Sequence, residues 1–215
     1  IGDWQQVVAV LSVFSMFLGA VAAIGQSDIK RLMAYSSIAH MGFALMGLAS
    51  GTAFGVQSML IYMVIYVTMN IGMFAAILSI EREGQPVSDI SALNMYSKHE
   101  PLKALCIGAL MFSMAGVPPL VGFFGKFYVL RAAYDANMAW LAVSGVVASV
   151  VGAFYYIRIV YFMYFGELSD PLDANPSLRL NIILVVSATL MIAGTFFSLF
   201  GIETLAQIAA GSLAN

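Results

Sequence analysis

Charged residues are scarce in this chain. Asp, Glu, Lys and Arg make up 9% of its 215 residues, whereas a soluble domain carries about a quarter. Hydrophobic residues make up 61%, and the mean hydropathy is +0.93. Such a chain cannot cover a surface that faces water, and we interpret it as an all-α integral membrane protein. The net charge of -2 is too small to indicate a nucleic acid partner.

Residues that hold cofactors are also missing. A single cysteine, Cys106, excludes an internal disulfide and a thiolate metal site. No Cys/His cluster could bind an iron–sulfur centre or haem, and no glycine-rich phosphate loop or dinucleotide fingerprint is present. No carboxylate lies deep in an apolar run. The sequence therefore predicts that this chain binds no cofactor or metal, and that any proton chemistry uses lysine, histidine and water.

Long apolar runs divide the chain. A spanning helix needs about 20 mostly apolar residues, and six runs of this kind predict six transmembrane helices. The predicted helices cover residues 5–25, 32–50, 56–80, 102–131, 138–165 and 180–202. Polar segments rich in Pro, Gly, Asp and Asn predict the two longest loops, after the third and fifth helices. We expect one transmembrane domain over residues 1–215. Because the first residue is isoleucine and no signal peptide is visible, we also expect a piece of a longer protein.

Lysine and arginine in the loops predict the orientation of the helices. Six of them fall on the side where odd-numbered helices end: Lys30, Arg31, Arg82, Lys98, Lys103 and Arg179. The other side has Arg131. The first side is therefore expected to be cytoplasmic, or its equivalent in an organelle, with both chain ends on the opposite side.

The stretch "GVPPLVGFFGKFYVL" predicts a break in the fourth helix. Proline removes a backbone donor and clashes with the carbonyl four residues back, so Pro118 and Pro119, preceded by Gly116, interrupt the helix near its middle. Interrupted helices mark the binding sites of many transporters. The alternative is a plain structural kink.

Lys126 follows this break by about two turns, among aromatic residues. A charged lysine at the centre of a membrane helix costs about 2.5–3.5 kcal/mol, and its removal from water favours the neutral amine. A lysine in this position could exchange a proton. The alternative is that its long stem carries the ammonium to the membrane interface.

His40 lies in the middle of the second helix. With Ser36, Ser37 and Tyr35 one turn earlier, it forms a polar stripe at helical spacing. Histidine titrates near neutrality and is a usual proton relay, so a relay role is one interpretation. A histidine that simply hydrogen-bonds a neighbouring helix is the other.

Three further polar residues are weaker candidates. Arg158 lies well inside the fifth helix and cannot release a proton in practice. It could hold a carboxylate or a carbonyl of the broken helix, tune a nearby lysine, or extend to the cytoplasmic interface. Asn70 in the third helix could join helices or tune the site. Lys30 follows a capping Asp28 and is explained mainly by topology, so its functional role is the weakest of these hypotheses.

The two segments "QSDIKRLMAYSSIAHMGF" and "AGVPPLVGFFGKFYVL" resemble the antiporter-like membrane subunits of respiratory complex I, NADH:quinone oxidoreductase. The segment "GFFGKFYVL" is most similar to the sequences of the group called subunit N. Subunit M typically has glutamate at the position of Lys126, and subunit L differs after the lysine. Subunit L also carries a lysine where this chain has Asn70.

The resemblance implies a subunit of fourteen helices with two inverted five-helix repeats, of which this chain looks like the last six helices. It implies that Lys126 is the protonatable lysine of the interrupted twelfth helix and that His40 lies in the tenth. NADH, FMN, iron–sulfur clusters and quinone would belong to other subunits, and the partners would be other membrane subunits of complex I, lipid, protons and water. The expected location is a bacterial inner membrane or a mitochondrial inner membrane. Alternatives are a subunit of a multi-subunit sodium/proton antiporter or membrane-bound hydrogenase, and a passive scaffold in the membrane arm.

Overall fold

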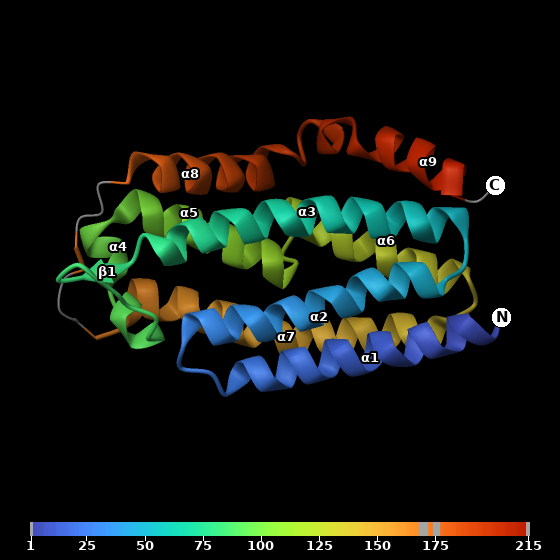
Figure 1. Cartoon of the computed structure of the whole chain (residues 1–215), viewed down its shortest axis with the longest axis horizontal. Helices are drawn as coiled ribbons and strands as arrows, with labels where there is room; N and C mark the ends of the chain where they lie inside the picture. The colour runs from blue at the N-terminus through green and yellow to red at the C-terminus, as the bar shows by residue number, and fades with distance from the viewer. Residues whose placement is uncertain (1, 168–171, 174–176, 214–215) are drawn as a thin grey trace.

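The protein is a bundle of helices that run along one common direction (Figure 1). The computed structural model describes residues 2–167, 172–173 and 177–213. Its longer helices are α1 (Asp3–Ile24), α2 (Ile29–Ala49), α3 (Ala53–Leu78), α5 (Pro101–Ala115), α6 (Val121–Asp135), α7 (Ala139–Phe165), α8 (Leu178–Ala193) and α9 (Ile202–Leu213). Its short elements are β1 (Glu81–Arg82), β2 (Gln85–Pro86), η1 (Ile90–Leu93), α4 (Tyr96–His99) and η2 (Ser198–Gly201).

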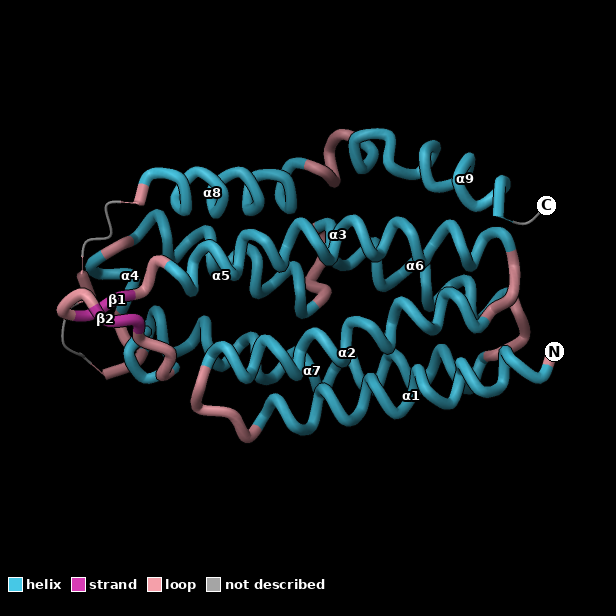
Figure 2. The backbone as a smooth tube through the Cα atoms, in the orientation of Figure 1, coloured by secondary structure: helices cyan, strands magenta, loops and turns pink. Residues whose placement is uncertain are grey.

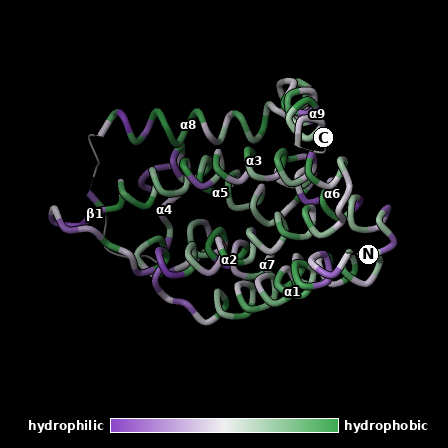
Figure 3. The backbone as a smooth tube through the Cα atoms, turned by 45° about the vertical axis from the view of Figure 1, so that its right-hand side comes forward, coloured by the Kyte–Doolittle hydropathy of each residue, from purple (hydrophilic) through white to green (hydrophobic). Residues whose placement is uncertain are grey.

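Apolar helices of membrane length dominate the bundle. Within the described residues, α1, α2, α3 and α7 are each long and apolar enough to cross a membrane, and α5 and α8 are shorter apolar helices. Hydrophobic residues fill the middle of the bundle, and hydrophilic ones gather in the loops at its ends (Figure 3). Helices α1 and α7 leave large apolar side chains exposed, for example Phe14 and Val150. This distribution fits an all-helical protein embedded in lipid.

The segment between α3 and α5 is more ordered than the predicted loop. Strands β1 and β2 form a two-residue antiparallel hairpin whose turn, Glu83–Gly84, has positive φ at both positions. The Gly84 N–H donates to a carboxylate oxygen of Asp173 at 2.9 Å, which ties the hairpin to the segment after α7. We call this end of the bundle the hairpin end; the N-terminus, the C-terminus and the α6–α7 turn lie at the opposite end (Figure 1). The predicted loop before α8 includes residues 168–171 and 174–176, which lie outside the described part of the chain.

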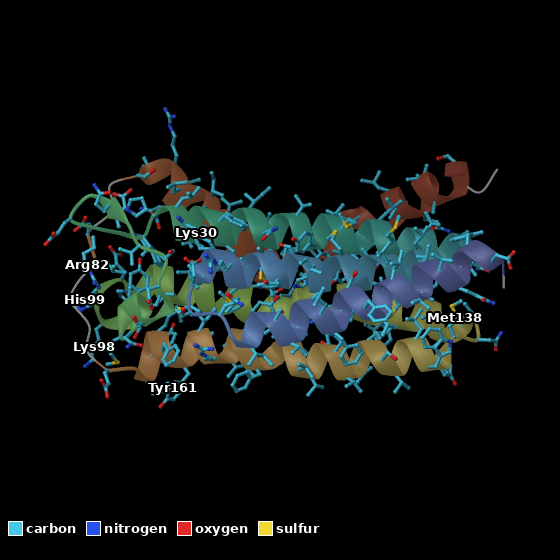
Figure 4. The ribbon with its side chains drawn as sticks, turned by 60° about the horizontal axis from the view of Figure 1, so that its bottom comes forward. Lys30, Arg82, Lys98, His99, Met138 and Tyr161 are labelled. Atoms are coloured by element: carbon cyan, nitrogen blue, oxygen red, sulfur yellow. The ribbon has the colours of Figure 1, made fainter. Side chains whose placement is uncertain are left out.

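Lysine and arginine gather at the hairpin end. The side chains of Lys30, Arg82, Lys98 and His99 all lie there, whereas Met138 lies at the opposite end (Figure 4). The structure therefore brings to one end the residues on which the predicted orientation depends. Lys103 lies there too, buried in the first turn of α5, where it pairs with Glu100 at 3.3 Å.

The predicted helix over residues 102–131 is two helices. Helix α5 ends at Ala115 and α6 begins at Val121, so the interruption lies where the glycine and the two prolines predict it. Figure 2 shows this loop in the middle of the bundle rather than at an end.

The prediction of one helix over residues 180–202 is wrong. Helix α8 ends at Ala193, the chain turns through residues 194–197 and η2, and α9 begins at Ile202. Two residues of this segment, Leu199 and Gly201, have positive φ, which a continuous helix does not allow. No proline marks this break, so the apolar run reads as uninterrupted in the sequence.

Close packing joins α1 to α2. A Cβ on Gly42 would lie 2.7 Å from the backbone nitrogen of Met16, so only glycine permits this approach. The Ser12 hydroxyl donates to the Gly42 carbonyl at 2.7 Å. Small residues and buried hydroxyls are the usual means of helix association in membranes. This contact fixes the position of α2, which carries His40.

Asp28 connects two loops at the hairpin end. Its carboxylate caps α2 by accepting from the Arg31 N–H at 3.0 Å, and it accepts from the Ser88 hydroxyl at 2.5 Å. The backbone N–H of Ile29 also donates to the Ser88 carbonyl at 2.7 Å. The Ser88 hydroxyl, followed by the Arg31 N–H, holds the pKa of Asp28 below its usual value of 3.8.

Replacement of Asp28 by alanine is expected to loosen residues 86–95. Loss of an N-cap costs about 0.5–2 kcal/mol, so amide hydrogen exchange in this segment should accelerate by about twofold to thirtyfold. Because the folded-state pKa of Asp28 is lowered, its stabilisation is present above pH 3.8 and is lost as the pH falls through the lower, folded-state value. Asparagine, which also caps helices, should keep most of the protection. Equal exchange rates in the alanine variant and the wild type would contradict this account.

Candidate functional site

Lys126 lies on the second turn of α6 and is 7% exposed. Its Nζ donates to the carbonyl of Ala115 at 3.0 Å and to the hydroxyl of Ser149 at 3.0 Å. It also lies 5.1 Å from the ring centroid of Phe43 on α2. The lysine therefore points into the bundle, where α2, α5 and α7 supply its neighbours. It does not extend to an interface.

The partner of the Lys126 ammonium is a helix end instead of a carboxylate. Ala115 is the last residue of α5, and the carbonyls at the C-terminal end of a helix carry partial negative charge. The ion pairs within the described residues are Lys103–Glu100 and Arg131–Asp135, and neither includes Lys126. A charge held only by dipoles and an aromatic face is more easily discharged than one held by an anion.

Gly116 creates this helix end. Its φ of 86° is left-handed, which glycine adopts without strain. The N–H groups of Gly116 and Val117 donate to the carbonyls of Ser113 and Phe112 at 3.0 Å each, which is the Schellman arrangement. A Cβ on Gly116 would lie 3.0 Å from Cδ of Lys126, so this glycine also makes room for the lysine.

The other side of the break is closed by Ser113. Its hydroxyl oxygen accepts from the N–H of Gly122, in the first turn of α6, at 3.0 Å. The start of α6 is thereby held against the end of α5. Pro118 and Pro119 occupy the loop between them, and Leu120 precedes α6 without a side-chain cap. The geometry of the break is therefore set by side-chain hydrogen bonds as well as by the prolines.

Tyrosines surround His40, which is 3% exposed. Its Nδ1 lies 2.6 Å from the hydroxyl of Tyr62 on α3, and its Nε2 lies 2.9 Å from the hydroxyl of Tyr156 on α7. The Tyr156 hydroxyl also hydrogen-bonds Ser36. A neutral imidazole has one N–H donor and one acceptor nitrogen, so one tyrosine donates to the ring and the other accepts from it. Exchange of these two roles carries a proton from one side of the ring to the other.

Lys126 and His40 line the same small cavity. Its walls include Phe43, Ser149 and Tyr156, and its volume is about 10 Å³, which is close to the room that one water molecule needs. The polar stripe that the sequence predicts on α2 thus meets the lysine of α6 in the interior. Of the stripe's serines, Ser36 joins this group directly. The Ser37 hydroxyl donates to the Met33 carbonyl of its own helix and also hydrogen-bonds Tyr66, which packs against the histidine.

Asn70 on α3 hydrogen-bonds a tyrosine that packs against His40. Its Nδ2 donates to the Tyr66 hydroxyl at 2.8 Å, and the Tyr66 ring packs 5.1 Å from the His40 ring. Its buried Oδ1 has no hydrogen-bond partner among the described residues. Asn70 therefore contacts the histidine side of the site through Tyr66.

Arg158, Tyr35 and Lys30 lie outside this cluster. Arg158 donates to the carbonyl of Ile24, the last residue of α1, at 2.8 Å, and not, among the described residues, to a carbonyl of the α5–α6 break. Tyr35 is half-buried against the hydrophobic core, and within the described chain no hydrogen bond links it to His40. Lys30 is exposed at the hairpin end (Figure 4).

Several neighbours of the site were not identified from the sequence. Tyr62, Tyr66 and Asn70 recur every four residues on α3, and this spacing places them on one helix face. That pattern could have indicated a polar face opposite His40. Ser149 and Tyr156, by contrast, carry no local signal, because an isolated serine and a tyrosine are ordinary in an apolar helix.

The chain is similar to several curated proteins. The chain is 59% identical over its whole length to NADH-quinone oxidoreductase subunit N of Rhodobacter capsulatus, of which it covers 45%. It is 62% identical over 99% of its length to subunit N of Jannaschia sp. (strain CCS1), again covering 45%. The chain thus spans about half the length of these curated relatives.

Solved structures agree at the level of the fold. A chain of respiratory complex I from Thermus thermophilus with bound aureothin is 28% identical, with a TM-score of 0.80 over 92% of this chain and 44% of that one. The Mrp complex from Dietzia sp. DQ12-45-1b gives a TM-score of 0.86 over 98% of this chain and 47% of that one, and at 23% identity this likeness shows the fold alone. The model of the NADH:quinone oxidoreductase/Mrp antiporter transmembrane family matches residues 1–152. The chain therefore belongs to the NADH:quinone oxidoreductase/Mrp antiporter transmembrane family.

Proposed function

We propose that this chain is the C-terminal half of a membrane-arm subunit of NADH:quinone oxidoreductase, and that it translocates protons as NADH oxidation and quinone reduction proceed elsewhere in the complex. The observation that carries the proposal is Lys126, a buried lysine without an anionic partner in the described chain, at the end of an interrupted helix. Identities of about 60% to proteins named as subunit N support the same assignment.

In the proposed mechanism Lys126 is the proton-loading site. The Ala115 carbonyl and the Ser149 hydroxyl hold the ammonium form, and discharge costs little Coulomb energy because no carboxylate is left unpaired. His40 faces the same cavity, and its ring takes up a proton at one nitrogen and releases one from the other, while the hydroxyls of Tyr62 and Tyr156 hold the ring in place. A charge change in the neighbouring part of the subunit then loads or unloads Lys126.

The chain is assigned to a single transmembrane domain with six crossings. Four are the long helices α1, α2, α3 and α7. The other two are composite: α5 with α6, and α8 with α9, each pair lying end to end (Figure 1). This unit corresponds to the last six helices of a fourteen-helix subunit, that is, the second inverted repeat and the final helix.

The remaining assignments concern the surroundings. Partners are the rest of this subunit, other membrane subunits of complex I, and lipid. NADH, FMN, iron–sulfur clusters and quinone are assigned to other subunits, and no cofactor to this chain. The location is the bacterial inner membrane, with the hairpin end in the cytoplasm and both ends of the chain on the other side. The cluster of basic residues at the hairpin end supports this orientation (Figure 4).

The orientation predicts which side of the membrane reaches Ser91. This residue is exposed at the hairpin end, whereas Cys106 is buried and should contribute little background. A membrane-impermeant maleimide should label a Ser91→Cys variant several-fold faster in inside-out vesicles than in right-side-out vesicles. Ala139→Cys, exposed at the opposite end, is the matched control and should show the reverse. Labelling of both positions with the sides exchanged would refute the orientation.

A sodium/proton antiporter subunit is the second candidate, because the Mrp complex has the same fold. Proton translocation per NADH in membranes with an assembled Lys126→Ala complex tests the first proposal. Loss of pumping that is independent of sodium supports the complex I assignment, and loss that depends on sodium supports the antiporter. Unchanged pumping would favour a passive scaffold.

A further inference from the structure

The two interrupted helices meet at their breaks. The loop of the α5–α6 pair and the loop of the α8–α9 pair both lie near the middle of the bundle (Figure 2). The Thr195 hydroxyl, in the second loop, donates to the Pro119 carbonyl, in the first, at 2.5 Å. One break therefore supplies a hydrogen-bond donor to the other.

A second contact joins α6 and α9, the helices that follow the two breaks. The Tyr128 hydroxyl, two residues after Lys126, donates to the carboxylate of Glu203 in the first turn of α9. The Glu203 carbonyl also accepts from the Gln57 side chain on α3 at 3.2 Å. The predicted sixth helix ends before Glu203, so this carboxylate is one that the sequence places in a tail and the structure places against α6.

We propose that the interrupted last helix is a clamp that positions the segment carrying Lys126, with Thr195 and Glu203 as its positioning residues. The proposal rests on the function proposed for Lys126. Thr195 holds the loop before α6, and Glu203 holds α6 itself beyond Lys126. The two contacts lie on either side of the lysine in the sequence.

The physical reason for Thr195 is the exposure of this loop to lipid. Val117 in the first loop and Phe196 and Phe197 in the second are exposed apolar side chains. A backbone carbonyl in such surroundings has no water to bind, and an unpaired one is costly. Without the Thr195 hydroxyl, we expect the Pro119 carbonyl to turn toward another donor.

A displacement of Pro119 would change the position of the Ala115 carbonyl, which accepts from Lys126, because one short loop joins the two residues. Ala115, whose carbonyl accepts from Lys126, lies four residues before Pro119, and the short loop between them is fixed at Gly116 by the Schellman bonds. A shift of this loop therefore alters the distance between the Lys126 ammonium and its acceptor. Since proton transfer depends strongly on hydrogen-bond geometry, we expect slower loading and unloading of the lysine.

The role assigned to Glu203 is that of a hydrogen-bond acceptor. Its carboxylate accepts a hydrogen bond from the Tyr128 hydroxyl, and the amide oxygen of glutamine can accept this bond equally well. A proton carrier at this position would instead require a group that can ionise. Glutamine and alanine at position 203 therefore separate the two roles.

The first test uses Thr195→Val in the full-length subunit within the complete complex. We expect normal assembly on native gels and a fall of about threefold to tenfold in the rate of NADH-driven proton translocation, the effect of one hydrogen bond at the site. Thr195→Ser, which keeps the hydroxyl, should restore the wild-type value. Thr68→Val is the matched control, since this half-buried hydroxyl donates to the Val64 carbonyl of its own helix, and it should leave pumping unchanged.

The second test compares Glu203→Gln with Glu203→Ala. Near-normal pumping with glutamine and a several-fold loss with alanine support the clamp. Loss with glutamine overturns the positioning role of Glu203, because it indicates a proton carrier. Three outcomes overturn the role of Thr195. The Thr195→Val variant could pump normally, it could fail to assemble, or the Thr195→Ser variant could pump as poorly as Thr195→Val. The Lys126→Ala variant is measured in the same experiment. If Lys126→Ala pumps normally, the function proposed for Lys126 fails. If Lys126→Ala is impaired but the Thr195 and Glu203 variants are not, only the clamp fails.

Discussion

Replacement of Lys126 by alanine in the full-length subunit should reduce coupled proton translocation by about tenfold or more while the complex still assembles. The side chain removed is the buried amine that binds the end of α5 and the hydroxyl of Ser149. Alanine has no group that takes up a proton, so the step assigned to this lysine cannot occur. Quinone reduction coupled to pumping should fall with it.

Arginine at position 126 separates charge from proton exchange. A guanidinium can bind the Ala115 carbonyl but does not release its proton under physiological conditions. Lys126→Arg should therefore pump as poorly as Lys126→Ala. Electron transfer from NADH to an artificial acceptor that bypasses the membrane arm should remain normal in both variants. Lys98→Ala, which removes an exposed lysine at the hairpin end, is the control and should behave as the wild type.

The rate of NADH-driven proton translocation in membrane vesicles decides the outcome, with assembly checked on native gels. Wild-type pumping in the alanine variant would return Lys126 to a structural lysine that binds a helix end. Failure of assembly in both variants would also argue against the proton-loading role, because it would assign the lysine to folding.

The sequence predicts a helix break correctly where one local signal dominates. The interruption after Ala115 follows from chemistry that is readable in the sequence, since Gly116 permits a left-handed φ and the two prolines cannot continue a helix. The break after Ala193 has glycines at residues 194 and 201 but no proline, so its signal is much weaker. "GTFFSLFG" is as apolar as its surroundings, and the left-handed Leu199 is a residue that seldom adopts this conformation. Tertiary contacts, including Thr195 with Pro119, accompany that break, and they join segments far apart in the chain.

The candidate site was predictable to a similar extent. Lys126 and His40 stand out because titratable groups are expensive inside a membrane. Their neighbours do not, because Ser149, Tyr62 and Tyr156 acquire meaning only when α3 and α7 pack beside α2. The sequence indicates which groups are costly to bury, and packing determines which groups make that burial tolerable.

The second large effect is expected at His40, where two roles must be separated. If the ring only satisfies the hydroxyls of Tyr62 and Tyr156, any side chain with one donor and one acceptor could replace it. If the ring relays protons, the replacement must also accept a proton at one atom and release one from another. Glutamine has the donor and the acceptor but does not titrate.

We therefore expect His40→Gln to assemble and still lose about tenfold or more of its coupled proton translocation. The amide can bond both tyrosine hydroxyls, so the packing of α2 against α3 and α7 should persist. His40→Ala leaves both hydroxyls without their partner in a buried site and should lose pumping and some assembly as well. The matched control is Ser144→Ala, because this exposed serine on α7 donates to the Trp140 carbonyl of its own helix. The rate of NADH-driven proton translocation by the assembled glutamine variant is the decisive quantity. A wild-type rate would assign His40 to structure, and a strongly reduced rate with intact assembly would assign it to the proton path beside Lys126.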